Sequence, residues 1–283
     1  MDPRNYQVSA LTGLLLYGVL QLGFEVGPGQ ILLILGCVLV TQWAAGQWFR
    51  LPVVEYRSAL ISGLSLCLLG RAENPGWLMA AGVIAILSKF LVRWRGKHVF
   101  NPTNVALASV LLLSGGGAWV SPGQWGSVAV LAFLFVCLGG LVVMRAGRAD
   151  VTLTFLVVWS ALLFGRAWWL GDPATIPWHR LESGSLLLFA FFMISDPRTT
   201  PDSRAGRMLF ALLVAVSAWW WQFLWFHNNG LIWSLVVWSP VVPLLDAWLP
   251  ASRHQWPVRR SAAVPAAPPS TSPSLSVISA PSL

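Results

Sequence analysis

Two polar stretches interrupt this apolar chain, and both combine amide or hydroxyl groups with cations next to an expected helix end. A helix N-terminus offers free backbone N–H groups and positive potential, so it favours an anion such as phosphate. Helices are expected to start at both stretches, and Ser203 is a possible N-cap for the second. The pair would therefore suit a phosphorylated, planar cofactor. The candidate residues are Lys97, His98, Asn101, Pro102 and Asn104 in the first stretch, and Asp196, Thr199, Thr200, Arg204, Gly206 and Arg207 in the second.

Plainer interpretations stay open for the same residues. Basic loops beside a membrane are usually topology signals, and Asp196-Pro197 is also a common way to end a helix. A single histidine such as His98 is more typical of a solvated loop than of a metal site, and we expect no metal. Asn101 needs a partner if it lies at the mouth of an apolar helix. Asp246 fits a buried carboxylate, a cap or an interfacial residue.

The composition is that of a polytopic membrane protein. Of the 283 residues, 56% are hydrophobic and only 10% are charged, and the mean hydropathy is +0.68. A soluble domain usually carries about 25% charged residues. No motif of soluble catalysis is present, such as a Walker loop or a nucleophile elbow. We therefore expect an all-α membrane fold and no catalytic residues.

Ten hydrophobic segments are expected, and two of them are too short to cross a bilayer comfortably, since a spanning helix needs roughly 20 residues. Proline disfavours helix in the residue before it, so one short helix should begin at 101–102 and the other should end near 195–196. The segments cover about 9–24, 29–49, 58–70, 76–93, 101–116, 125–144, 151–169, 183–195, 206–226 and 230–249.

The basic residues predict the orientation of these segments. With ten crossings, 15 of the 18 lysines and arginines fall in loops on one side and 3 on the other. Basic loops stay in the cytoplasm, so both termini are predicted to be cytoplasmic. The net charge of +8 then reflects membrane topology, and the lipid bilayer, not nucleic acid, is the expected partner.

Two units follow from the composition. Residues 1–249 form the transmembrane helical domain, and residues 250–283 form a Pro/Ser/Ala-rich cytoplasmic tail that is expected to be disordered. Within the first unit, the segments at 101–116 and 183–195 look like corresponding parts of two halves. Weak internal symmetry of this kind is typical of inverted repeats, which place a binding site at their interface.

Three stretches carry a resemblance to a known family. GKHVFNPTNVAL resembles the Gly-x-x-x-Phe-Asn-Pro element of the membrane subunits RnfD and NqrB. ESGSLLLFAFFMISDPRTTPDSRAGRMLFALL resembles the family's Ser-Gly…Asp-Pro-x-Thr…Gly-Arg signature, and GLIWSLVVWSPVVPLLD resembles its last helix. The match covers about residues 80–250, and its sequence is most similar to the UnbU-type branch found in enediyne biosynthesis clusters.

The resemblance implies a bundle of inverted repeats similar to urea-channel folds, in a bacterial cytoplasmic (inner) membrane. It also implies flavin binding (FMN or riboflavin) and electron transfer coupled to sodium or protons. The family's threonine-linked FMN is not expected, because its Ser-Gly-Ala-Thr motif is absent and the loop at 114–125 has no threonine. By position the motif residues are Asn101, Pro102, Ser183, Gly184, Asp196, Thr199, Gly206 and Arg207.

Three functional hypotheses follow. The leading one is an RnfD/NqrB-like subunit without catalysis of its own, which binds flavin non-covalently between the halves and receives electrons from partner redox subunits. The second is a channel or transporter for a small solute or ion on the same fold, with the cofactor lost. The third is a membrane scaffold for biosynthetic enzymes, which would use the tail.

Overall fold

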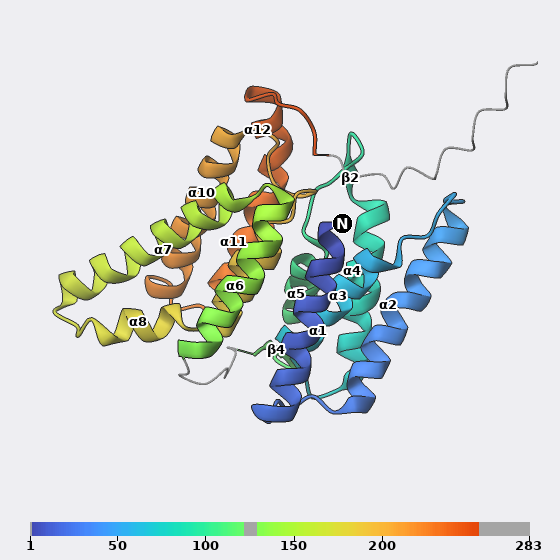
Figure 1. Ribbon diagram of the computed structural model, residues 1–283, viewed down its shortest axis with the longest axis horizontal. Helices are drawn as coiled ribbons and strands as arrows, with labels where there is room; N and C mark the ends of the chain where they lie inside the picture. The colour runs from blue at the N-terminus through green and yellow to red at the C-terminus, as the bar shows by residue number, and fades with distance from the viewer. Residues whose placement is uncertain (1, 122–128, 255–283) are drawn as a thin grey trace, which may run out of the picture.

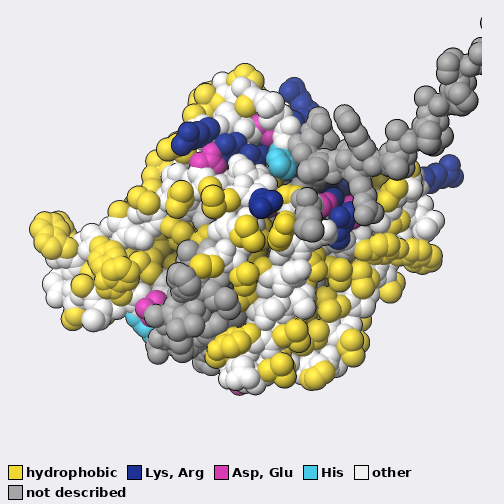
Figure 2. Space-filling model, viewed as in Figure 1, with side chains coloured by type: hydrophobic (Ala, Val, Ile, Leu, Met, Phe, Trp, Pro, Cys, Tyr) yellow, Lys and Arg dark blue, Asp and Glu magenta, His cyan; other side chains and the backbone are white. Residues whose placement is uncertain are grey.

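The computed structural model describes residues 2–121 and 129–254. Its helices run between two ends of the molecule (Figure 1). The N-terminus, the hairpin at β2 and the end of α12 lie at one end, which we call the charged face. Figure 2 shows why: in this view most of the lysine and arginine side chains gather there, while many apolar side chains lie on the rest of the surface.

The first half of the chain folds into five helices and four short strands. Proline at the first helical position and a side-chain cap start several of them; Asn74, for example, accepts from the N–H of Gly76 at the start of α4. The helices are α1 Pro3–Gln21, α2 Pro28–Trp48, α3 Tyr56–Leu69, α4 Pro75–Leu91 and α5 Pro102–Leu113, and the strands are β1 Gly70–Ala72, β2 Arg93–Trp94, β3 Lys97–His98 and β4 Ala118–Val120.

The strands form two small antiparallel pairs, one at each face. β1 pairs with β4, with Gly70 opposite Val120. β2 pairs with β3, with Arg93 opposite His98, and this hairpin leads the chain back into the molecule toward α5.

The second half contains α6 Ala129–Ala146, α7 Ala149–Leu170, α8 Thr175–Leu181, α9 Gly184–Leu188, η1 Phe189–Met193, α10 Arg204–Phe223, α11 Gly230–Trp238, η2 Ser239–Val241 and α12 Val242–Trp248. η1 is a π-helix that continues α9, and η2 is a 3₁₀ turn between α11 and α12. Pro240 lies in that turn, where its missing N–H interrupts the helix.

All ten predicted hydrophobic segments contain helix, so the prediction of an all-α polytopic membrane protein is confirmed. Within residues 2–121 and 129–254, three helices are long and apolar enough to span a bilayer by themselves, namely Pro28–Trp48, Ala149–Leu170 and the run Gly230–Trp248. The short α8 was not predicted, because seven residues with only a few apolar side chains give no clear periodic signal.

The contacts between helices follow the same order in both halves. α1 packs on α3, α2 on α4 and α4 on α5; in the second half α6 packs on α9 and η1, α7 on α10 and α10 on α11. The halves meet through equivalent partners, α1 with α6 and α5 with α11. Each half therefore has five equivalent elements. Because five is an odd number, the second half crosses in the opposite direction to the first, which is the arrangement of an inverted repeat.

This order corrects the predicted correspondence between the halves. The segment at 183–195, now α9 and η1, corresponds to α3, and the segment at 101–116, now α5, corresponds to α11. Both pairs are short helices, so length alone did not show which short segment matched which.

Two of these short helices start inside the protein. The chain reaches α5 from the charged face and α11 from the opposite face. Yet their first turns touch, because Asn104 Nδ2 donates to the Ile232 carbonyl at 3.1 Å. Helix ends in the interior need protein partners for their free backbone groups. The residues around these two ends are therefore the natural place to look for a site.

Candidate functional site

Asn101 joins the start of α5 to the end of η1. Its Oδ1 accepts from the N–H of Asn104 at 3.0 Å, and its Nδ2 donates to the carbonyl of Met193 at 3.2 Å. The side chain is 5% exposed. Asn101 with Pro102 at the first helical position therefore explains why the helix begins where the sequence predicts.

Asn104 and Thr200 are the least exposed of the candidate polar residues, and Asn104 lies at the start of α5. Its amide nitrogen is bonded to Ile232, as described above, which fixes the orientation of the amide. Among the described residues its Oδ1 has no hydrogen-bond partner, although the side chain is only 1% exposed. A buried acceptor without a donor is a position that water or a ligand can satisfy.

The second polar stretch forms a closed turn. The Asp196 carbonyl accepts from Thr200 Oγ1 at 3.0 Å and from Thr199 Oγ1 at 3.4 Å, and the Asp196 carboxylate accepts from the N–H of Arg198 at 3.0 Å. Burial raises the pKa of Asp196 despite the opposing effects of that hydrogen bond and of nearby cations. The hydroxyl groups of Thr199 and Thr200 thus stabilise the turn through bonds to the Asp196 carbonyl.

The start of α10 is held by three interactions. Ser203 caps the helix by accepting from the N–H of Gly206 at 3.0 Å. Arg207 donates to the carboxylate of Asp150 in α7, at 2.8 Å from Nε, and to the Asp202 carbonyl at 2.7 Å. Arg204 is exposed on the first turn. The Arg207 side chain is therefore bonded to Asp150 and Asp202, whereas the Arg204 side chain is exposed on the surface.

Lys97 lies between two carboxylates. Its Nζ is 3.0 Å from Asp202 Oδ1 and 2.7 Å from Asp246 Oδ2, and Asp246 Oδ1 also accepts from the N–H of Asp202. These contacts tie the β2–β3 hairpin to α12 and to the turn before α10. Asp246 was predicted to be a buried carboxylate, a cap or an interfacial residue, and the structure shows a partly buried carboxylate that is paired with Lys97.

His98 is buried beside Arg198, whose Nη1 lies 3.1 Å from His98 Nε2. A guanidinium is always a donor, so Nε2 must accept and the imidazole is neutral. Burial, together with the positive charges of Arg198, Arg93 and Lys89, lowers the pKa of His98 to about 3. The prediction of a solvated loop histidine is wrong: β3 carries this side chain into a positively charged interior.

Ser183 and Gly184 do not join this group. Ser183 precedes α9 on the opposite face, and its Oγ lies 2.9 Å from Ser185 Oγ. The sequence placed these residues in the same site as Asp196. The structure separates them by the length of α9 and η1, because one chain segment runs from one face into the interior between them.

Two cavities lie at the ends of this segment. The charged-face cavity has a volume of about 300 Å³ and is bordered by α1, α3, the end of α4, the start of α5 and the turn after η1. The opposite-face cavity has a volume of about 860 Å³ and is bordered by β4, α8, α9, the end of α10 and the start of α11. His98, Asn101, Pro102 and Asp196 line the first, and Ser183 lines the second.

The two cavities correspond under the repeat. Each lies between a short helix that ends inside the protein and another that starts there: η1 and α5 at the first cavity, and α3 and α11 at the second. Side chains of η1 face both, with Phe191 and Phe192 on the charged-face cavity and Phe189 and Met193 on the other. η1 therefore separates the cavities.

Some residues of these cavities were not candidates from sequence. Lys89 was counted only as a topology signal, although an ionisable residue at the end of an apolar segment was a usable hint. Gln42 and Trp119 gave no signal, because nothing in their local sequence shows that α2 and β4 border a cavity.

Part of the chain is similar to known proteins. Residues 116–254 match the NQR2, RnfD, RnfE family. The D subunit of the ion-translocating oxidoreductase complex from Cronobacter sakazakii is 30% identical over 156 residues, which are 53% of this chain and 41% of that protein. The protein of the same name in Escherichia coli is 32% identical over 139 residues, which are 48% of this chain and 36% of the relative. The match thus spans about two-fifths of the relatives' length.

Proposed function

Because residues 116–254 match the NQR2, RnfD, RnfE family, we propose that the chain is a membrane subunit of an ion-translocating electron-transfer complex. Its curated relatives are named as subunits of such complexes. Partner subunits would supply and accept the electrons. The finer placement in the UnbU-type branch and the cytoplasmic location of the termini stay predictions.

The opposite-face cavity supports a role in holding a non-covalent flavin, and this cavity carries the proposal. Trp119, Trp159 and Phe189 offer apolar ring faces, and Ser183 and Gln222 offer hydrogen-bonding groups. Ligand sites usually have volumes of about 300–1,000 Å³ with mostly apolar walls and a few placed polar groups. A cavity of about 860 Å³ accommodates a flavin ring system within that range.

The candidate residues of the charged face fit the flavin less well. Lys97 and Arg207 are paired with carboxylates, and Asn101 and Thr200 bond to backbone carbonyls. The nearby cavity, at about 300 Å³, is at the lower limit for a ligand of this kind. We therefore place the flavin proposal at the opposite face, where Ser183 and Gly184 are the motif residues.

When bound, a flavin would supply the one- and two-electron chemistry, and the protein would position it and exclude water. Trp119 and Phe189 would hold the ring. Ser183, which lines the same cavity, would contact its polar edge.

Absorbance of the full chain, purified in a neutral detergent, tests the proposal before and after acid precipitation. A flavin spectrum in the supernatant is the expected result. Trp119→Ala should reduce the flavin content several-fold, whereas Trp168→Ala should leave it unchanged, because Trp168 is 86% exposed and lies outside the cavity. Yellow colour kept in the pellet would mean covalent attachment. A folded, colourless protein would overturn the flavin proposal.

One observation favours the channel or transporter as a second candidate. The two cavities approach η1 from opposite faces, and only this π-helix and its neighbours separate them. A π-helical turn is often found at functional positions. Colourless protein that conducts a small solute or ion in liposomes without partners would select this function.

A further inference from the structure

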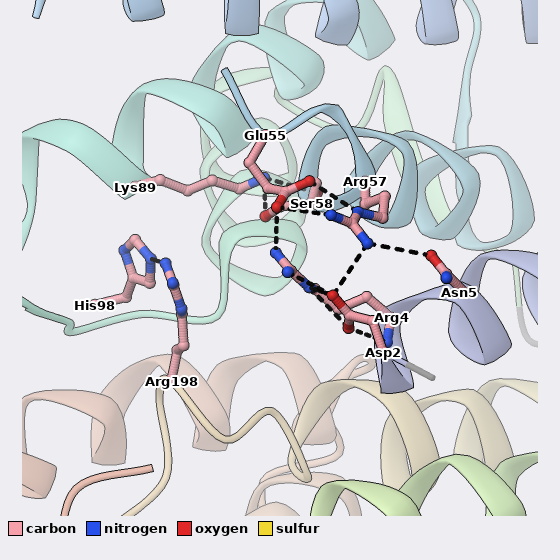
Figure 3. Close-up of polar contacts among 9 residues, drawn as sticks. All are labelled: Asp2, Arg4, Asn5, Glu55, Arg57, Ser58, Lys89, His98 and Arg198. Atoms are coloured by element: carbon pink, nitrogen blue, oxygen red, sulfur yellow. Dashed lines mark hydrogen bonds and ion pairs between the residues drawn. The ribbon is translucent and has the colours of Figure 1, made fainter. Parts of the chain in front are cut away.

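The charged-face cavity has a positively charged wall that the proposed redox function does not use. Arg4, Lys89, Arg93 and Arg198 line it, together with the acids Glu55 and Asp196. Figure 3 shows Lys89, Arg4 and Glu55 on one side of this region and His98 with Arg198 on the other. The question is which of these charges already have partners.

Four residues near the start of α1 and α3 neutralise one another. Arg4 bonds to Asp2 at 2.6 Å and to Glu55 at 2.9 Å, and Arg57 bonds to Glu55 at 2.8 Å and to Asp2 at 3.1 Å (Figure 3). Two cations thus match two carboxylates. Burial opposes ionisation of Asp2 and Glu55, but the arginines outweigh it, and the pKa of both carboxyls is lowered. Glu55 is therefore already paired with arginines and does not offset the other positive charges of the cavity wall.

The cations of the wall that lie outside this network are Lys89, Arg93 and Arg198. Among the described residues none of the three has a carboxylate oxygen within 4.0 Å of its charged nitrogens. Arg93 Nε donates to the Lys89 carbonyl, and Arg198 donates to His98. These partners are neutral, so they satisfy hydrogen bonds without balancing charge.

Lys89 is the deepest of the three cations. Its side chain is 5% exposed, and its Nζ donates to the carbonyl and Oγ of Ser58 at 2.8 and 3.1 Å (Figure 3). An ammonium has three N–H groups, so one is left for the cavity. Arg93 and Arg198 are exposed at its border. The cations therefore lead from the surface to a buried donor.

Asp196 balances at most one of these charges. It is the one other acid among the described residues of the wall, and its carboxylate already accepts from the N–H of Arg198. At most one negative charge thus faces three positive ones. The neutral state of His98 is consistent with this excess, because added positive charge there is unfavourable.

Gln42 gives an independent indication of a ligand. This α2 side chain lines the same cavity and is 4% exposed, yet among the described residues its Oε1 has no hydrogen-bond partner. A buried amide without a partner is costly, because it gives up its hydrogen bonds to water. An amide with no partner to orient it can present either its oxygen or its NH₂ group to a molecule in the cavity.

We propose that the charged-face cavity binds a small oxyanion, with Lys89 and Arg198 holding a phosphate or carboxylate group. The volume of about 300 Å³ limits the molecule to a small metabolite or to a lipid headgroup that enters from the membrane. The exposed arginines attract the anion, and Lys89 binds it where water is scarce. This site is independent of the flavin proposal, since it lies on the other side of η1.

Thermal unfolding of the full chain in neutral detergent tests the site, because a ligand that binds the folded state raises the melting temperature. The probes are inorganic phosphate and acetate against sodium chloride of equal ionic strength, and phosphatidylglycerol against phosphatidylcholine in mixed micelles. A saturable rise with phosphate or acetate would identify a free anion. A rise with phosphatidylglycerol alone would assign the same cations to a lipid headgroup.

Matched variants show whether the cavity is responsible. Arg198→Gln and Lys89→Gln should weaken binding about tenfold or more, since hydrogen bonds to charged groups are strong. Arg204→Gln removes the same charge from an exposed position on the same face, outside the cavity, and should change affinity less than about twofold. If Lys89→Gln does not fold, Arg198→Gln alone decides, because Arg198 lies on an exposed turn. Equal loss in Arg204→Gln, or no saturable effect of any probe, would overturn the proposal.

Discussion

Replacement of Lys97 by methionine should destabilise the fold more than the loss of any exposed cation. Lys97 Nζ lies within 3.0 Å of two carboxylates, and the side chains of Lys97, Asp202 and Asp246 are 10%, 9% and 19% exposed. Methionine keeps most of the apolar stem and removes the charge. Asp202 and Asp246 would then face each other without a cation between them.

The magnitude follows from this burial. Breaking a buried ion pair costs roughly 3–5 kcal/mol when the remaining charge stays dry. Water reaches Asp246 in part, so we expect a loss of about 2–3 kcal/mol in the free energy of unfolding. Arg204→Met, on the same face but exposed, should change it by less than about 0.5 kcal/mol.

Reversible unfolding in mixed detergent micelles, followed by tryptophan fluorescence, would measure both variants. Asp246→Asn in the Lys97→Met background removes one of the two repelling charges and keeps Oδ1 as the acceptor for the N–H of Asp202. The double variant should therefore be more stable than Lys97→Met by about 1 kcal/mol. Equal losses in Lys97→Met and Arg204→Met would refute the reasoning, because Lys97 would then behave as a solvated charge.

Further predictions use the same unfolding assay. Asn101→Ala should cost about 2–3 kcal/mol, because it removes a helix cap and leaves the Met193 carbonyl without its donor; a loss under about 1 kcal/mol would contradict the assigned role. Gly206→Ala should cost about 1–2 kcal/mol, since a Cβ there would lie 2.7 Å from the oxygen that caps α10; unchanged stability would show that the cap is dispensable. Asp2 and Glu55 have a lowered pKa in the folded state, so their contribution is complete above the ordinary carboxyl pKa of about 4 and is lost as the pH falls through their folded values. Arg57→Gln should therefore weaken the loss of melting temperature between neutral and acidic pH, and an identical pH profile would count against the network.

The helices and the charged face could be predicted because both depend on local composition. Apolar runs of sufficient length predict helices in a bilayer, and basic loops predict which ends share a side. Most of the lysine and arginine side chains seen in Figure 2 gather at the charged face, as the loop count requires. Disorder was predicted for residues 250–283, and from residue 255 onward this tail lies outside the described residues.

The site could be predicted only in part, because it depends on how far inside the protein each helix starts or ends. Asn101-Pro102 correctly marked the start of α5, but nothing local shows that this start lies inside the protein beside Ile232. The same missing information caused the error at Ser183, since a segment of ten residues looks alike whether its ends lie on one face or on two. The partners of Lys97 lie more than 100 residues away in the chain and have no local signal.

The two proposed sites make different demands on η1. Electron transfer from a flavin in the opposite-face cavity needs no continuous passage, so η1 can stay in place with Phe189 on one cavity and Phe191 on the other. Passage of a solute needs η1 to move. Movement would break the bond between Asn101 Nδ2 and the Met193 carbonyl, and the bond between Thr152 Oγ1 and the Ala190 carbonyl at 2.8 Å. Both bonds are buried, so a barrier at η1 is expected unless a ligand stabilises the open state. An oxyanion next to Asn101 and the turn after η1 would lie where it biases such a movement, which would give the charged-face cavity a regulatory position if the protein passes a solute.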